Sequence, residues 1–238
     1  MILGAVILGL LATSTLLAGA WISFRFRPSS RTVGLVMGFG AGALIGAVAY
    51  DLFPETSRDP LSFLMLGLGA IVFYYGTSFI ERRSGAKGGK GESAAQTGKE
   101  ILLGALLDGI PESLVLGMLL AIGGAVSIAF FGAVLISNLP EGLAASSEME
   151  RGGTPRRRIY TMWVAVILIC VLSTMGGVVL VQIAPQVEGI YIMAAAGGAV
   201  LAMLSDSMIP GGFREGGRPT GLLVVLGFAF AAGLGVLG

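Results

Sequence analysis

Eight apolar runs, each long enough to cross a lipid bilayer as a helix, constrain this chain more than any other feature. About 20 apolar residues in α-helix span the ~30 Å hydrocarbon core. The sequence predicts spans at residues 1–24, 32–53, 61–80, 101–121, 126–146, 160–183, 190–209 and 220–237. Only 12% of the residues are charged, about half the usual share in a soluble domain. We therefore expect an all-α integral membrane protein, with residues 1–238 forming a single transmembrane domain.

Basic residues are distributed very unevenly over the predicted loops. If the N-terminus lies outside, the inside loops hold 14 of the 15 basic residues, and this asymmetry satisfies the positive-inside rule for a cell-membrane protein. Only Arg58 then lies outside. The Gly-, Ser- and Lys-rich segment 84–98 has no apolar period. It is predicted to be a flexible cytoplasmic linker between the third and fourth spans.

Two spans carry similar sequences. Residues 42–51 read GALIGAVAYD, residues 197–206 read GGAVLAMLSD, and a proline follows each, at Pro54 and Pro210. In the predicted topology the two spans run in opposite directions, as in the inverted repeats of secondary transporters. Chance similarity of two Gly/Ala-rich helices is the alternative. The pattern predicts a 3+2+3 arrangement of spans, and the Gly-rich faces would also suit a homodimer.

Six carboxylates lie inside the predicted spans or at their rims. They are Asp51, Glu55, Asp108, Glu112, Glu141 and Asp206. No Lys or Arg shares the apolar core with them, and the chain has no His. Because a carboxylate in an apolar medium must be paired, protonated or bound to a cation, only protons and metal ions remain as partners. Acidic residues at this depth are functional candidates by default.

Residue spacing brings oxygens together on two helix faces. Asp108 and Glu112 are four residues apart, as are Ser137 and Glu141, so each pair lies on one face of its helix. A divalent cation is therefore expected between the fourth and fifth spans, either as one ion or as two ions bridged by the glutamates.

A proline precedes each of these two glutamates. Pro111 and Pro140 remove one helix hydrogen bond each, which frees the carbonyl groups of Leu107 and Ile136 and bends the helix axis. A single transmembrane proline is more often a plain kink. Two Pro-Glu pairs in neighbouring spans are harder to explain in that way, and they favour a functional site.

The motifs resemble those of the ZIP (Zrt/Irt-like) divalent-metal transporters, over nearly the whole chain. The matching strings are DGIPES at 108–113, SNLPEG at 137–142 and DLFPE at 51–55. The resemblance implies eight spans and a central metal held by Asp108, Glu112, Ser137 and Glu141. It also implies a second metal that involves Asn138 and the two glutamates.

The departures from the family are consistent. Where the family tends to use His, this chain has Asp51, Asp108 and Ser137. An all-oxygen site favours harder cations such as Mn²⁺, Mg²⁺ or Ca²⁺, although Fe²⁺ and Zn²⁺ also bind carboxylates. Gly109 stands where the family has a second-metal ligand, so a single site is the safer expectation.

The expected function is transport of a divalent cation of the Zn, Fe or Mn class toward the cytoplasm, rather than enzymatic catalysis. Asp51 and Glu55 would line the outer end of the path and Asp206 the cytoplasmic end. No phosphate-binding string of the ATPase type occurs, and the net charge of +1 gives no basic field for nucleic acid. The remaining alternatives are a transport-inactive metal-binding or sensor protein and an intramembrane aspartyl-type hydrolase.

Overall fold

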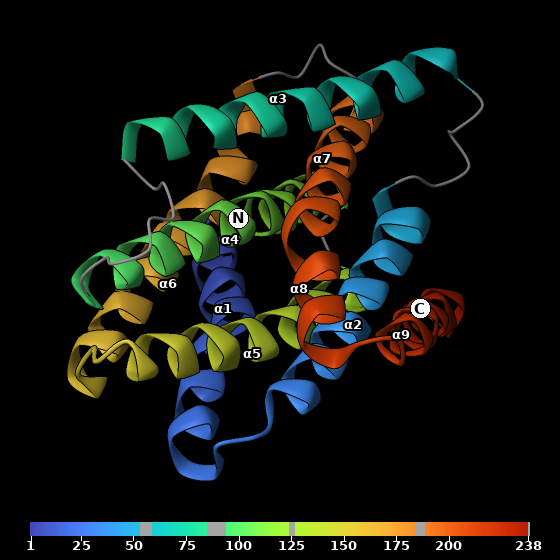
Figure 1. Cartoon of the computed structure of the whole chain (residues 1–238). Coiled ribbons are helices and arrows are strands. Elements are labelled where there is room, and N and C mark those ends of the chain that lie inside the picture. Colours follow the sequence, from blue (N-terminus) through green and yellow to red (C-terminus); the bar gives the residue numbers. More distant parts are fainter. Residues whose placement is uncertain (53–58, 85–93, 124–126, 184–188, 238) are drawn as a thin grey trace.

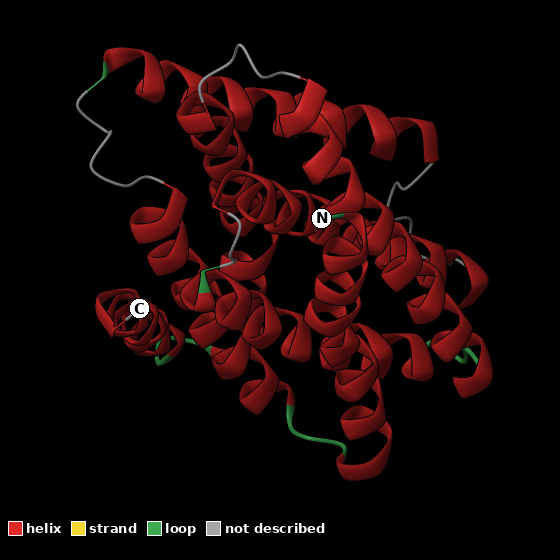
Figure 2. Ribbon diagram, turned by 180° about the vertical axis from the view of Figure 1, so that it is seen from behind, coloured by secondary structure: helices red, strands yellow, loops and turns green. Residues whose placement is uncertain are grey.

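The chain folds into a bundle of long helices joined by short connections (Figures 1 and 2). The computed structural model describes residues 1–52, 59–84, 94–123, 127–183 and 189–237, and within these residues it contains helices and loops but no strands. The helices are α1 Ile2–Phe26, α2 Ser30–Ala47, α3 Pro60–Ser84, α4 Ala94–Gly123, α5 Ile128–Arg151, α6 Arg156–Ile183, α7 Gly189–Met203, α8 Ile209–Gly216 and α9 Thr220–Leu237.

Helix length and apolar surface identify a multi-pass membrane protein, as the sequence predicts. Within the described residues, seven helical segments are long and apolar enough to cross a bilayer, with α7 and α8 forming one of them over Gly189–Gly216. The apolar stretch of α9, Thr220–Gly235, is shorter. Large apolar side chains on α3, such as Leu64 and Val72, are well exposed. On a helix at the edge of the bundle, such side chains suit contact with lipid tails (Figure 1).

Close backbone packing divides the helices into groups. A Cβ atom at Gly19 of α1 would lie 2.3 Å from the Leu139 carbonyl oxygen of α5, and one at Gly117 of α4 would lie 1.9 Å from the Thr174 carbonyl oxygen of α6. Helices α1, α4, α5 and α6 therefore form one tightly packed group. This grouping cuts across the 3+2+3 order of the spans in the sequence.

The other helices also pack through close backbone contacts at glycines. A Cβ atom at Gly42 of α2 would lie 1.9 Å from the Val224 carbonyl oxygen of α9, and one at Gly69 of α3 would lie 1.8 Å from the Ala195 carbonyl oxygen of α7. Small residues thus let backbones touch where apolar side chains alone give little driving force in lipid. Figure 1 shows the two resulting outer pairs, α3 with α7 and α2 with α9, at different edges of the bundle.

Both halves of the sequence repeat end in a π-helical turn. The turn η1 covers Val48–Leu52 and contains Asp51, and the turn η3 covers Leu204–Met208 and contains Asp206. Such turns are rare in proteins overall, and those that do occur are often at functional sites. Two α-helices that change to π-helix at corresponding aspartates favour a true repeat over chance similarity.

Helical structure extends into both ends of the predicted linker 84–98. Ser84 is the last residue of α3, and Ala94 begins α4. Residues 85–93, the centre of that linker, lie outside the described residues.

Candidate functional site

The two helices that carry the Pro-Glu pairs remain helical through their prolines. Pro111 lies inside α4 and Pro140 inside α5. Because proline has no N–H group, one carbonyl group in each helix lacks its usual donor. The loss of this hydrogen bond therefore leaves each helix unbroken. The side chains before and after each proline keep a helical register.

Glu112 is buried at the centre of the site. The residue is only 2% exposed, and among the described residues only Ser137 of α5 offers a hydrogen bond to its carboxylate, at 3.4 Å to each oxygen. This is long for an O–H···O bond. The Ser137 hydroxyl lies closer to the Val134 carbonyl oxygen, at 3.0 Å. Within the described part of the chain, Glu112 thus has no short hydrogen bond.

Among the described residues, two buried oxygen atoms of α5 have no hydrogen-bond partner. Asn138 donates from Nδ2 to the carbonyl oxygen of Ala12 at 3.1 Å, which fixes the orientation of its amide. The Oδ1 atom of Asn138 is then buried with no hydrogen bond among the described residues. The Oε1 atom of Glu141 is also buried and has no hydrogen bond among them. Residues 138 and 141 are one helical turn apart. Buried acceptors of this kind cost free energy unless something else satisfies them.

Asp108 joins this group from the next turn of α4. Its Oδ1 atom accepts a hydrogen bond of 3.0 Å from the Ser207 hydroxyl in the turn η3. Its carboxylate interacts electrostatically with Glu112 and Glu141. Asp108, Glu112, Ser137 and Glu141 therefore lie near one another, whereas Asn138 forms its hydrogen bond with Ala12 of α1.

Asp206 lies beside this group but is exposed. It interacts electrostatically with Asp108 and borders a hollow of about 190 Å³ together with Ser205, Phe73 and Tyr74. Sequence reasoning missed Ser207, whose hydroxyl links η3 to Asp108. No local pattern identifies Ser207, because the contact joins residues 99 positions apart.

The structure places Asp51 away from the glutamates. Its carboxylate accepts a hydrogen bond of 2.5 Å from the hydroxyl of Ser127. Ser127 caps α5 by accepting hydrogen bonds from the amides of Ala129 and Phe130. Residue 127 is about 20 Å along the helix axis from residue 141. Asp51 thus sits at the end of α5 that is far from Glu141. Glu55, the other predicted residue of this end, lies outside the described residues.

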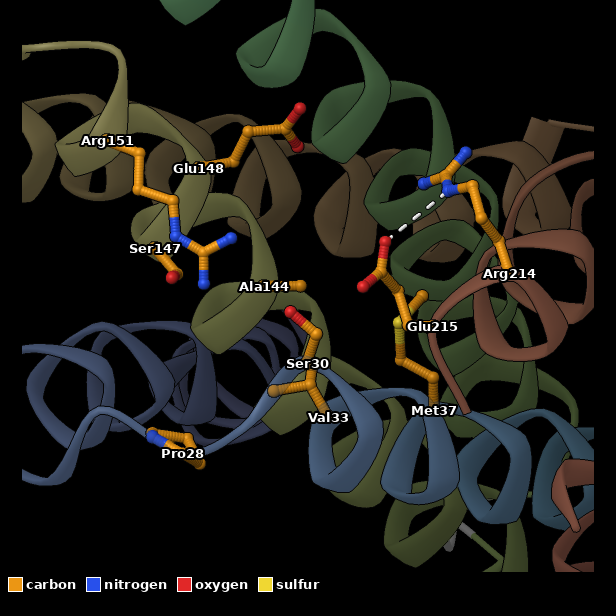
Figure 3. Close-up of a pocket in the computed structure, with 10 residues that line it drawn as sticks. All are labelled: Pro28, Ser30, Val33, Met37, Ala144, Ser147, Glu148, Arg151, Arg214 and Glu215. Atoms are coloured by element: carbon orange, nitrogen blue, oxygen red, sulfur yellow. Dashed lines mark ion pairs between the residues drawn. The ribbon is translucent and has the colours of Figure 1, made fainter. Parts of the chain in front are cut away.

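At the opposite end of α5 the same helix face borders a second hollow. This cavity of about 290 Å³ lies between α5, the start of α2 and α8, and Figure 3 shows the residues that line it. Ala144, one turn beyond Glu141, lines it, and so do Glu148 and Glu215. No local sequence pattern places Glu148 at this cavity, because α8 and α5 come together only in the folded chain.

Among the described residues, no carboxylate of the site forms an ion pair with a basic side chain. Among the described residues the ion pairs are Arg156–Glu150 at 2.7 Å and Arg214–Glu215 at 3.5 Å, and neither involves a site glutamate. In the same residues, no three His, Cys, Asp or Glu side chains already form a metal cage. The site is thus a set of anionic and carbonyl-type oxygens with few donors, which protons, water or a cation can compensate.

Comparison with known proteins adds no assignment. No protein-family model matches the chain, and no curated protein matches it significantly.

Proposed function

We propose that this protein transports a divalent metal ion of the Zn, Fe or Mn class toward the cytoplasm, through the oxygen-lined site between α4 and α5. The observation that carries the proposal is the pair of buried, unpartnered acceptors Asn138 Oδ1 and Glu141 Oε1 beside the poorly hydrogen-bonded Glu112. A cation satisfies oxygens that lack donors, whereas a purely structural site would supply the donors from the protein.

The donor set fits a metal ion as cargo. Asp108, Glu112 and Glu141 offer carboxylates, and Ser137 and Asn138 offer neutral oxygens, which suit hard or borderline divalent cations. Because no three acidic groups in the described residues already lie close enough to hold a metal ion, the carboxylates must draw inward when the ion arrives. A site that closes around its ion and opens again is compatible with release, as transport requires.

The helix packing supports a mechanism in which two bodies move. In this proposal the eight spans, with α9 as the last and the N-terminus outside, form an inverted repeat in the cell membrane. The group α1, α4, α5 and α6 carries the site, and the remaining helices flank it. The two bodies meet at Gly40 of α2, where a Cβ atom would lie 3.0 Å from the Cα atom of Ser137. Gly40 thus lies against the helix turn that carries the site.

Metal flux through proteoliposomes tests the proposal. We expect the wild-type protein to admit Mn²⁺, Fe²⁺ or Zn²⁺ to a lumenal metal dye, and Glu112→Gln and Glu141→Gln each to abolish most of the flux. Glu150→Gln is the matched control, because Glu150 lies on α5 in a surface ion pair with Arg156. Its flux should equal that of the wild type.

The other outcomes separate the alternatives. Metal binding by the wild type with no flux for any of the three ions would identify a sensor and refute transport. Peptide hydrolysis that depends on both glutamates, again without flux, would identify an intramembrane hydrolase.

A further inference from the structure

A third hollow lies where α1 ends, α2 begins and α5 ends. Its volume is about 380 Å³, and Ser23, Arg27, Pro28, Ser147, Glu150 and Arg151 line it. Pro28, Ser147 and Arg151 also border the cavity of Figure 3, so the two hollows adjoin. We propose that this third hollow binds a phosphate group, the group that an anionic phospholipid presents at the membrane surface. The site is independent of the proposed cation transport.

Guanidinium groups give the hollow its positive charge. Arg27 and Arg151 both line it, and neither has a carboxylate partner within the described residues. The single acid in the lining, Glu150, is already engaged by Arg156, whose Nε and Nη2 atoms both lie 2.7 Å from its Oε1 atom. Glu148 lines only the adjoining hollow. Two free guanidinium groups beside a neutralised carboxylate favour an anion, and arginine matches phosphate geometry well.

The hydroxyl group of Ser23 adds a neutral donor to the lining. Ser23 is only 2% exposed, and its Oγ atom forms no hydrogen bond within the described part of the chain, although its carbonyl group accepts from the Arg27 amide at 3.1 Å. This Oγ atom is not among the fully buried side-chain atoms that lack a partner, so it is open to the hollow and can donate a hydrogen bond to a bound group. Ser147 supplies a second hydroxyl group, and Figure 3 shows it next to the Arg151 guanidinium.

Backbone conformation holds Arg27 at this position. Arg27 ends α1 with φ 48° and ψ 57°, and it is the only non-glycine residue with positive φ among those described. Glycine is the usual residue at such a helix end, and a non-glycine residue there costs free energy. An unfavourable conformation retained at a pocket is a reason to infer function. The chain then passes through Pro28 to the N-terminus of α2, whose dipole also favours an anion.

Native mass spectrometry of the full chain in detergent tests the site. Phosphatidylglycerol is the probe, phosphatidylcholine is the lipid without net charge, and inorganic phosphate is the free anion. The wild type should retain one phosphatidylglycerol in preference to phosphatidylcholine. Arg27→Gly and Arg151→Gln should each weaken this binding roughly tenfold, because each removes charge-assisted hydrogen bonds. Arg218→Gln is the matched control, since Arg218 is exposed and lines neither hollow.

The arms of the experiment distinguish the source of the phosphate group. Displacement of the lipid by inorganic phosphate would assign the site to phosphate itself, and failure of displacement would assign it to the intact lipid headgroup. Equal retention of both lipids, together with Arg27→Gly and Arg151→Gln behaving like Arg218→Gln, would overturn the proposal. Because glycine suits a left-handed conformation, Arg27→Gly should keep its melting temperature without lipid, which guards against misfolding as the cause.

Discussion

The contact between α4 and α6 gives the sharpest test of the fold. A Cβ atom added at Gly117 of α4 would lie 1.9 Å from the carbonyl oxygen of Thr174, and one added at Gly177 of α6 would lie 2.1 Å from the carbonyl oxygen of Leu114. Real Cβ atoms essentially never approach other atoms to less than 3.0 Å. Alanine at either position must therefore push the two helices apart by roughly 1 Å, since overpacked side chains shift the backbone.

The expected change in the free energy of unfolding is the difference between two opposing contributions. Alanine favours a helix over glycine by up to ~1 kcal/mol, whereas overpacking costs ~1–3 kcal/mol or more. The clash at Gly117 is with backbone, so no side chain can rotate away, and the upper part of that range applies. We expect Gly117→Ala to lower the free energy of unfolding by about 1–2 kcal/mol net. Gly104→Ala on the same helix, where nothing lies within 4 Å, should cost nothing.

Thermal unfolding of the purified protein in detergent measures the difference. For a chain of this size each kcal/mol corresponds to about 2–4 °C in Tm, so Gly117→Ala should melt several degrees below the wild type. Gly177→Ala should behave like Gly117→Ala, and Gly104→Ala should melt with the wild type or above it. Equal melting temperatures for Gly117→Ala and Gly104→Ala would show that α4 and α6 are not in backbone contact.

Three further predictions concern charge. The Tyr191 hydroxyl donates to Asp59 at 2.6 Å, and this bond holds the pKa of Asp59 below its usual value of 3.8. Tyr191→Phe should raise that pKa, so the Tm advantage of the wild type should be full above about pH 4 and disappear as the pH falls through the lowered value. Asp108→His should raise the uptake of Zn²⁺ relative to Mn²⁺ roughly tenfold, because imidazole suits Zn²⁺, and an unchanged ratio would exclude Asp108 as a ligand. Metal affinity measured by titration should fall with acidification, since carboxylate ligands must be deprotonated, whereas pH-independent affinity would argue against a carboxylate site.

Local sequence patterns predicted the features that depend on local physics. Hydropathy located the helices to within a few residues in most cases, because each span must satisfy its own backbone hydrogen bonds and so needs a continuous apolar run. The i, i+4 spacing of Asp108 with Glu112 and of Ser137 with Glu141 placed each pair on one face, and the structure brings the two faces together. Helical register alone was sufficient for both predictions.

Features that depend on long-range packing were not predictable in this way. The association of α1 and α6 with α4 and α5 rests on backbone contacts at glycines such as Gly19 and Gly117, and the sequence does not say which helix a glycine faces. The π-helical turns at Asp51 and Asp206 were also missed. So was the contact of Ser207 with Asp108, because its two residues meet only in the folded chain.

The energetics of the site argue that its acids are retained for function. Leaving one buried acceptor without a partner costs about 1–3 kcal/mol, and more when the group is charged. Within the described residues, Glu141 Oε1 and Asn138 Oδ1 are buried acceptors without a partner. Glu112 has only long hydrogen bonds, from Ser137. Their combined cost is a large share of the ~5–15 kcal/mol that stabilises a typical domain. Apolar residues of similar size would remove this cost. The proposed binding of a cation gives a reason for keeping these oxygens in the interior, because apolar residues cannot bind a cation.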